Sequence, residues 1–297
     1  MGYGSFNYTT YATTSRFLTK NADGTDKAVH EVFRQRSIHA SLDPKKIVVR
    51  ESCDSDDSPE SVPIIVALDV TGSMGHIAQS MVSTQLGTLM EGIWDNKVIK
   101  YPHLMFMAVG DVEYDDYPLQ VSQFEADVSI VQQLSNIYVE GGGGGNNTES
   151  YDLPWYFAAT KTKIDSFDKR GKKGYLFTIG DEMPPSGVKK VHLKETFGAE
   201  QEVNYSPEAL LKMAQEKYNV FHVLVEEGSY ARKKLDTVVP AWKELLGKRT
   251  LCLKDYTKLS EVISAAIRVS EGEDPETVIE SYQGTKTKSV IRHAFSV

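Results

Sequence analysis

The stretch that decides the fold runs from residue 62 to residue 74 and reads VPIIVALDVTGSM. Its first seven residues are apolar, and a turn that contains a glycine begins at Asp69. A helical pattern of apolar residues follows the turn, up to about Met90. Short apolar runs that lead through a turn into a helix are typical of buried parallel strands. We therefore expect a buried strand here, followed directly by a helix.

The polar side chains of this turn lie where a ligand site is expected. Asp69, Thr71 and Ser73 follow the strand at alternate positions. Open α/β sheets bind their ligands at the carboxyl ends of the strands. One carboxylate and two hydroxyls can converge there on one point, and hard oxygen ligands suit Mg²⁺ or Mn²⁺ better than zinc. The simpler alternative is a helix N-cap, because Thr and Ser are good capping residues.

Residues 69–74 resemble the Asp-x-Ser/Thr-x-Ser signature of the von Willebrand factor A (vWA) domain family, in its intracellular bacterial form. The metal-ion-dependent adhesion site of that family holds one divalent cation, with further ligands from a later Thr and a later Asp. Residues 141–148, GGGGGNNT, resemble the glycine-rich loop that carries the Thr, and Asp181 follows a later apolar run. The resemblance covers about residues 62–269. It implies a metal site made of Asp69, Thr71, Ser73, Thr148 and Asp181.

Apolar runs alternate with helical patterns through the rest of this region. Further strands are expected at 101–109, 174–182, 220–225 and 250–253. Ser206 followed by Pro207 is typical of a helix start. Such alternation predicts an α/β fold with a Rossmann-like, mainly parallel central sheet flanked by helices on both faces. This is also the fold that the vWA resemblance implies.

The chain divides by composition into three parts. We expect an N-terminal extension with an acidic linker at 1–61, the vWA domain at 62–271, and a polar C-terminal tail without regular structure at 272–297. Within the extension, alternation at 5–11 predicts a strand, and 27–39 predicts a short helix.

Two segments near the predicted site are expected to form a helix and a long loop. A single helix is predicted from Glu149 to about Phe167. The polar stretch at 182–203 is too long for a tight connection, and long loops beside a site are often functional. It can shield the site or recognise a partner.

The net charge and the cysteine content indicate which classes of partner and which cellular compartment to expect. The formal net charge of −8 disfavours a nucleic-acid backbone or an anionic membrane as partner, because either would require a basic face. The two cysteines, Cys53 and Cys252, form no metal-ligand spacing and fit a reducing compartment. No secretory signal is evident at the N-terminus, and no apolar run approaches the length needed to span a bilayer. A cytoplasmic protein is expected.

The vWA resemblance also implies a function. In that family the open coordination position of the Mg²⁺ or Mn²⁺ ion accepts an acidic side chain from a binding partner. The chain is accordingly expected to be a non-enzymatic adaptor or scaffold whose partner protein supplies a Glu or Asp ligand. Intracellular bacterial proteins with such domains often work with AAA+ ATPases of the MoxR type, and such an ATPase or its substrate is the expected partner.

Three alternatives stay open. Residues 69–73 also resemble the phospho-acceptor loop of haloacid dehalogenase-like phosphotransferases, with Asp69 as the nucleophile beside Mg²⁺. The ion can instead be structural and only brace three loops. A second cation site is possible in the acidic run at 111–116, which is otherwise a solvated loop. Glu149 and Glu182 adjoin predicted ligands and can tune the site through hydrogen bonds.

Overall fold

The computed structural model describes residues 8–25, 27–72, 74–80, 84–95, 99–139, 147–198 and 202–296. The strands are β1 (Arg50–Ser52), β2 (Val62–Asp69), β3 (Pro102–Val109), β4 (Leu119–Val121), β5 (Thr162–Ile164), β6 (Gly174–Gly180), β7 (Tyr218–Val225) and β8 (Thr250–Leu253). The helices are α1 (Tyr8–Thr19), α2 (Val29–Val32), α3 (Gly75–Ser80), α4 (Leu86–Asp95), α5 (Ser129–Ser135), α6 (Asp152–Thr160), α7 (Asp165–Asp168), α8 (Lys190–Phe197), α9 (Pro207–Lys217), α10 (Ala231–Leu246), α11 (Leu259–Ser270), α12 (Pro275–Ser281) and α13 (Thr285–Ser296). Single 3₁₀ turns occupy Gly247–Arg249 and Tyr256–Lys258.

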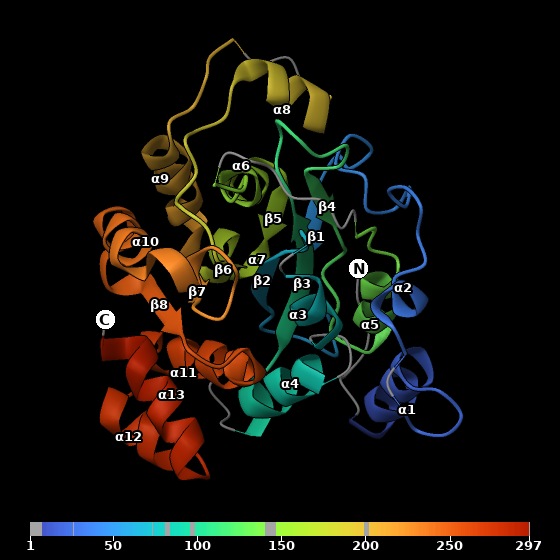
Figure 1. Cartoon of the computed structure of the whole chain (residues 1–297), viewed down its shortest axis with the longest axis vertical. Coiled ribbons are helices and arrows are strands. Elements are labelled where there is room, and N and C mark those ends of the chain that lie inside the picture. Colours follow the sequence, from blue (N-terminus) through green and yellow to red (C-terminus); the bar gives the residue numbers. More distant parts are fainter. Residues whose placement is uncertain are drawn as a thin grey trace.

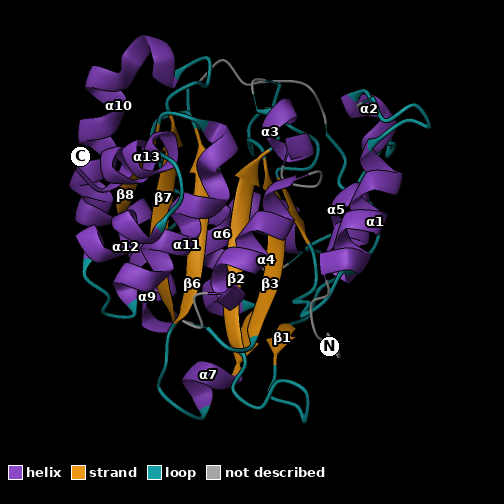
Figure 2. Cartoon of the chain, turned by 90° about the horizontal axis from the view of Figure 1, so that it is seen from below, coloured by secondary structure: helices purple, strands orange, loops and turns teal. Residues whose placement is uncertain are grey.

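The central sheet has the strand order β4-β3-β2-β6-β7-β8. Only the edge strand β4 runs antiparallel to its neighbour, and the other pairs are parallel. Strands β2 and β3 are buried along their whole length, as expected for strands covered on both faces. Figure 2 shows the parallel strands ending at the edge where α3 lies. The predicted mainly parallel α/β sheet is confirmed.

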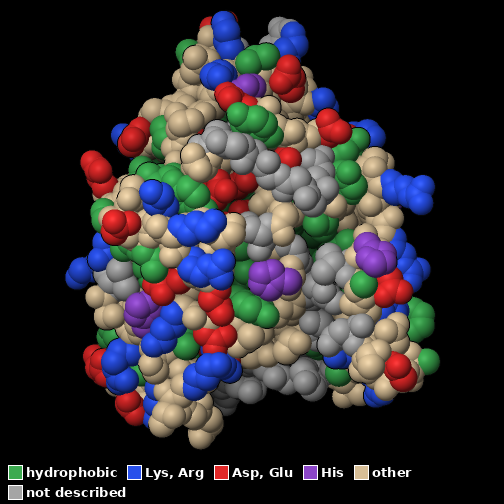
Figure 3. Space-filling view, in the orientation of Figure 1, with side chains coloured by type: hydrophobic (Ala, Val, Ile, Leu, Met, Phe, Trp, Pro, Cys, Tyr) green, Lys and Arg blue, Asp and Glu red, His purple; other side chains and the backbone are tan. Residues whose placement is uncertain are grey.

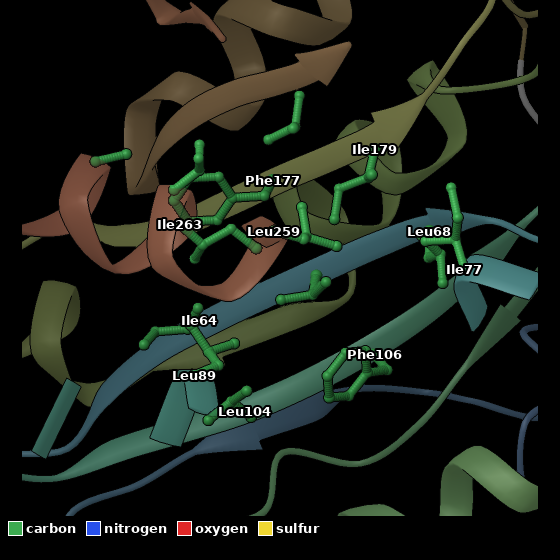
Figure 4. Packing of buried hydrophobic residues seen from close by; sticks show 14 of the residues in the cluster. Ile64, Leu68, Ile77, Leu89, Leu104, Phe106, Phe177, Ile179, Leu259 and Ile263 are labelled. Atoms are coloured by element: carbon green, nitrogen blue, oxygen red, sulfur yellow. The ribbon is translucent and has the colours of Figure 1, made fainter. Parts of the chain in front are cut away.

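Alternate side chains of β2 enter two separate cores, because successive residues of a strand point to opposite faces. Ile64, Val66 and Leu68 pack with α4, α11 and α13 on one face. Ile65 and Ala67 pack with α6, α9 and α10 on the other. Figure 4 shows part of the first core, where side chains of β2, β3 and β6 meet those of α4 and α11. The two layers hold the carboxyl ends of the strands in fixed register.

The strand expected at 5–11 is wrong over the residues that the structure describes, since α1 begins at Tyr8. Tyr11, Ser15 and Thr19 are buried at four-residue intervals, which is the period of one helix face. The alternation of Tyr and Thr imitated a strand, but packing of this face selected the helix. The helix predicted at 27–39 is shorter than expected and spans only Val29–Val32.

The single helix predicted from Glu149 to Phe167 is also wrong. The chain forms α6, leaves the helical path at Lys161, and continues as strand β5 and helix α7. Strand β5 pairs in parallel with β1, in the register Glu51 to Lys163. The partner strand lies more than a hundred residues earlier in the chain, so tertiary pairing replaced a locally plausible helix.

The C-terminal residues form α12 and α13, so the expectation of an irregular tail is wrong. Asp274 caps α12 by accepting a hydrogen bond from the Thr277 amide, and Pro275 takes the first helical position. Val290, Ile291 and Ala294 of α13 are buried against the first core. Figure 1 shows both helices beside α11, at the end of the molecule opposite α8.

The polar stretch at 182–203 is not wholly irregular, because it contains α8. This helix lies above α6 at the top of Figure 1. None of the helices in the described ranges is long and apolar enough to cross a membrane.

Candidate functional site

Asp69 ends the central strand β2 and is fully buried. Its Oδ1 atom accepts hydrogen bonds from the Thr71 amide (2.9 Å) and from Thr71 Oγ1 (2.7 Å). These two bonds close the turn that the sequence predicted and fix the carboxylate relative to the Thr71 hydroxyl. Ser73, the third residue of the motif, lies outside the described residues, as does the glycine run at 141–145.

Tyr151 approaches the same carboxylate from the other core. Its hydroxyl donates a hydrogen bond to Asp69 Oδ2 at 3.2 Å, and its ring is fully buried. The ring packs edge-on against His222 and Trp242. Gly180 makes room for it, because any side chain at that position would overlap the Tyr151 hydroxyl. Nothing in the local sequence indicated this contact.

Thr148 lies against the segment that follows β6. A parallel bridge joins it to Met183, and the Met183 amide donates to the Asn147 carbonyl at 3.3 Å. The Thr148 hydroxyl lies 3.2 Å from both the Met183 and the Pro184 carbonyl oxygens. The structure thus places this threonine beside the loop that begins at Asp181.

Asp181 follows β6, the strand next to β2, and its side chain is fully buried. Its Oδ2 atom accepts a hydrogen bond from the Tyr230 amide at 2.8 Å. The loop after β7 comes so close that a side chain at Gly228 would overlap the Asp181 carboxyl group. Four of the five predicted ligands, Asp69, Thr71, Thr148 and Asp181, therefore lie on segments at one edge of the sheet.

Acidic side chains lie close to one another around this edge and raise each other's pKa. Burial, with an added contribution from the charge of Asp181, raises the pKa of Asp69. Burial and the charge of Asp69 raise the pKa of Glu149, and the same two causes raise the pKa of Glu182 to about 7. Glu149 Oε2 and Glu182 Oε2 are buried without a hydrogen-bond partner.

A divalent cation would fit such a site. Unpaired charge in a low-dielectric interior is costly, and a cation offsets that cost by direct attraction. The donor set of carboxylate and hydroxyl oxygens suits Mg²⁺ or Mn²⁺. Over the described ranges, no three His, Cys, Asp or Glu side chains are grouped to hold a metal. The predicted ligands Asp69 and Asp181 would instead depend on hydroxyls and water to complete the coordination.

The acidic run at 111–116 is partly folded into this edge. Asp111 is buried, and its amide donates to Asp115 Oδ2 at 2.7 Å. Its Oδ1 atom accepts a hydrogen bond from the Glu113 amide at 2.8 Å. The expectation of a wholly solvated loop is therefore wrong for Asp111, whose side chain is buried.

The loops described above lie at the carboxyl ends of the parallel strands. The mainly parallel sheet flanked by helices is the fold that the vWA resemblance implies. No protein-family model matches the sequence, and no curated protein matches it.

Several solved structures are similar to this chain. The pilus adhesin SpaC from Lactobacillus rhamnosus GG, in its open conformation, is 10% identical with a TM-score of 0.46, over 78% of this chain and 31% of SpaC. A von Willebrand factor type A protein from Catenulispora acidiphila is 12% identical with a TM-score of 0.39, over 72% of this chain and 44% of that protein. BatB from Bacteroides thetaiotaomicron is 13% identical with a TM-score of 0.41, over 72% of this chain and 100% of BatB. This chain thus spans less than half the length of the first two.

Proposed function

We propose that this protein is a Mg²⁺-dependent protein-binding module, an adaptor or scaffold rather than an enzyme. The observation that carries the proposal is the meeting of three separate loops at one sheet edge, where Asp69, Thr148 and Asp181 are all supplied from different strands or loops. A cation held by few carboxylates and several neutral hydroxyls stays electrophilic, and Mg²⁺ keeps exchangeable waters. An acidic side chain of a partner protein would replace one of those waters.

Calorimetric titration of Mg²⁺ and Mn²⁺ into metal-stripped protein tests the site. We expect one ion per chain in the wild type and a metal affinity at least about tenfold lower in Thr148→Ala and Asp181→Ala. Even residues that only orient a metal ligand lower metal affinity by about that factor when they are removed. Asp236→Ala and Thr237→Ala, two exposed positions on α10, are matched controls. Unchanged affinity in both site variants would show that these loops do not share an ion.

The partner that we propose is an AAA+ ATPase of the MoxR type, or a substrate of such an ATPase, acting with this protein in the cytoplasm. Affinity capture from the native host, with Mg²⁺ and with a chelator, tests this. We expect an ATPase that is retained with Mg²⁺ and lost with the chelator. Asp181→Ala should lose it under both conditions, whereas recovery of the same proteins with and without Mg²⁺ would contradict a metal-mediated contact.

A further inference from the structure

The side chain of Trp242, on α10, reaches the loop that carries the predicted ligand Asp181. Its Nε1 atom donates a hydrogen bond to the Glu182 carbonyl oxygen at 2.9 Å. Trp242 is fully buried in the second core, on the β2 face of Ile65 and Ala67. Figure 3 shows acidic side chains recessed in the face that carries this edge of the sheet. Since Trp242 has no exposed surface, it can influence that face only by holding other residues in place.

The Glu182 carbonyl lies between the attachment points of two predicted ligands. Asp181 comes directly before it in the chain, and Met183, directly after it, forms the parallel bridge to Thr148. The Thr148 hydroxyl also lies 3.2 Å from the Met183 carbonyl oxygen. A hydrogen bond to Glu182 therefore fixes the backbone that sets Asp181 relative to Thr148.

The rings around Trp242 connect it to the remaining predicted carboxylate ligand. The Trp242 ring centroid lies 5.6 Å from that of Tyr151, whose hydroxyl donates to Asp69 Oδ2. On its other contact, the indole lies flat against the His222 ring, with centroids 3.5 Å apart and planes 6° apart. His222 is fixed in turn, because its Nδ1 atom lies 2.9 Å from Thr178 Oγ1 on β6. Aromatic contacts of this kind add specific geometry to burial.

We propose that Trp242 is a positioning residue that sets the geometry of the predicted metal site from inside the protein. It supports Asp69 through Tyr151, and it supports the Asp181 loop through Glu182. The inference rests on the proposed function, since it concerns the same ion. Helix α10 supplies no predicted ligand, yet it governs the affinity for the cation through this one side chain.

Trp155 is a matched control in the same core. It is also fully buried, and its ring centroid lies 6.5 Å from that of Trp242. Its Nε1 atom is buried without a hydrogen-bond partner. Replacing either tryptophan with phenylalanine removes one indole N–H and part of one buried ring, so both variants should lose stability in urea. Only Trp242→Phe also removes a bond to the loop of a predicted ligand.

Hydrogen exchange of the metal-free protein, followed by NMR, measures the positioning directly. The Tyr230 amide donates to Asp181 Oδ2, and the Met183 amide donates to the Asn147 carbonyl. Both amides should exchange at least about fivefold faster in Trp242→Phe, because loss of the bond to Glu182 makes local opening of the loop more frequent. In Trp155→Phe both rates should stay within about twofold of the wild type, since local opening of the loop does not depend on that side chain.

Mg²⁺ binding provides two further measurements. Calorimetry should give an affinity about tenfold lower in Trp242→Phe, and an affinity within about twofold of the wild type in Trp155→Phe. In the wild type, the NMR signal of the Trp242 indole N–H should shift with Mg²⁺ at the same midpoint as the calorimetric titration, and that of Trp155 should not. This measurement needs no variant, so it holds even where Trp242→Phe does not fold.

Three results would overturn the proposal: wild-type exchange rates in Trp242→Phe, equal acceleration in both tryptophan variants, or a Trp242 indole signal that does not respond to bound Mg²⁺. The outcome is separable from that of the proposed function. A wild type that binds no Mg²⁺ would remove the metal-dependent function, while faster exchange confined to Trp242→Phe would keep Trp242 as the residue that positions these loops. Mg²⁺ binding with unchanged exchange in Trp242→Phe would remove the role of Trp242 alone.

Discussion

The Tyr151 hydroxyl donates a hydrogen bond to Asp69 Oδ2 across 82 residues of sequence. It joins the loop after Thr148 to the end of the central strand. Asp69 Oδ1 is already held by Thr71, so the two oxygens of one carboxylate are fixed from two different loops. Groups that orient a metal ligand in this way commonly change metal affinity tenfold or more when they are removed.

Tyr151→Phe should therefore weaken Mg²⁺ binding by about tenfold. It should also lower the free energy of unfolding of the metal-free protein by about 1 kcal/mol, the usual net value of one hydrogen bond. Calorimetry and urea denaturation measure the two effects. Tyr218→Phe is the control. Tyr218 is the first residue of β7, and its buried hydroxyl lies 2.8 Å from Thr162 Oγ1, so this variant also removes one buried hydroxyl contact. That variant should lose stability and keep its Mg²⁺ affinity, and an equal loss of affinity in both would contradict a specific role for Tyr151.

Gly228→Ala should destabilise the protein and weaken the metal site together. The new methyl group would overlap the Asp181 carboxyl group, which is fully buried and cannot move away freely. Overpacking of this kind costs about 1–3 kcal/mol. Thermal denaturation and Mg²⁺ titration measure the outcome. Ser229→Ala, at the exposed neighbour in the same loop, should change neither quantity, and a Gly228→Ala variant of normal stability would show that the loop relaxes.

Acidification should destabilise the fold through His103. Burial lowers the pKa of this histidine from 6.5 to about 4, and its Nδ1 atom lies 3.1 Å from Ser52 Oγ. In the unfolded chain His103 takes up a proton near pH 6.5, whereas in the folded chain it stays neutral down to about pH 4. The contribution of His103 to the free energy of unfolding is therefore fully present above pH 6.5 and is lost as the pH falls towards 4.

Urea denaturation of the metal-free protein between pH 7 and pH 4 measures that loss. His103→Gln should flatten the pH dependence over this range by at most about 3 kcal/mol. His30→Gln, at an exposed histidine, should leave the slope unchanged. If His103→Gln keeps the full wild-type slope, other groups are responsible for acid sensitivity.

The phosphotransferase alternative predicts that Asp69 is a nucleophile, whereas we propose that it holds a cation. If Asp69 were a nucleophile, the protein would hydrolyse a simple phosphate ester such as p-nitrophenyl phosphate with Mg²⁺. That activity would vanish in Asp69→Asn and survive in Thr148→Ala. We expect no turnover above the level of Asp69→Asn in any form of the protein, because we propose that Asp69 holds a cation. Turnover that vanishes in Asp69→Asn and survives in Thr148→Ala would replace the binding-module proposal.

The local sequence was enough to predict most strands of the sheet and the turn at Asp69. The apolar run at 62–68 and the turn after it could be recognised because burial and turn chemistry act between near neighbours. Ser206 was correctly predicted as a helix cap, and its Oγ atom accepts from the Ala209 amide. The Asp274-Pro275 pair carries a similar cap signal, and overlooking it led to the wrong prediction of an irregular tail.

Other features depended on partners that are distant in the chain. Strand β5 exists because β1 pairs with it, and α1 forms because one face packs on the first core. No local pattern specifies either partner, so propensity alone predicted a helix in the first case and a strand in the second. Tertiary packing outweighs such weak local preferences.

The sequence by itself determined which residues could offer oxygen ligands. Asp69 is the last residue of β2 and Thr71 follows two residues later, so the local chain alone places both at the end of that strand. Only the tertiary structure decided the environment of those ligands. Tyr151 reaches Asp69 because it precedes α6, which shares the second core with Ile65 and Ala67 of β2. Gly228 reaches Asp181 because β7 lies next to β6. Contacts of this kind follow from which elements become neighbours on folding, and that is settled by the packing of both cores as a whole.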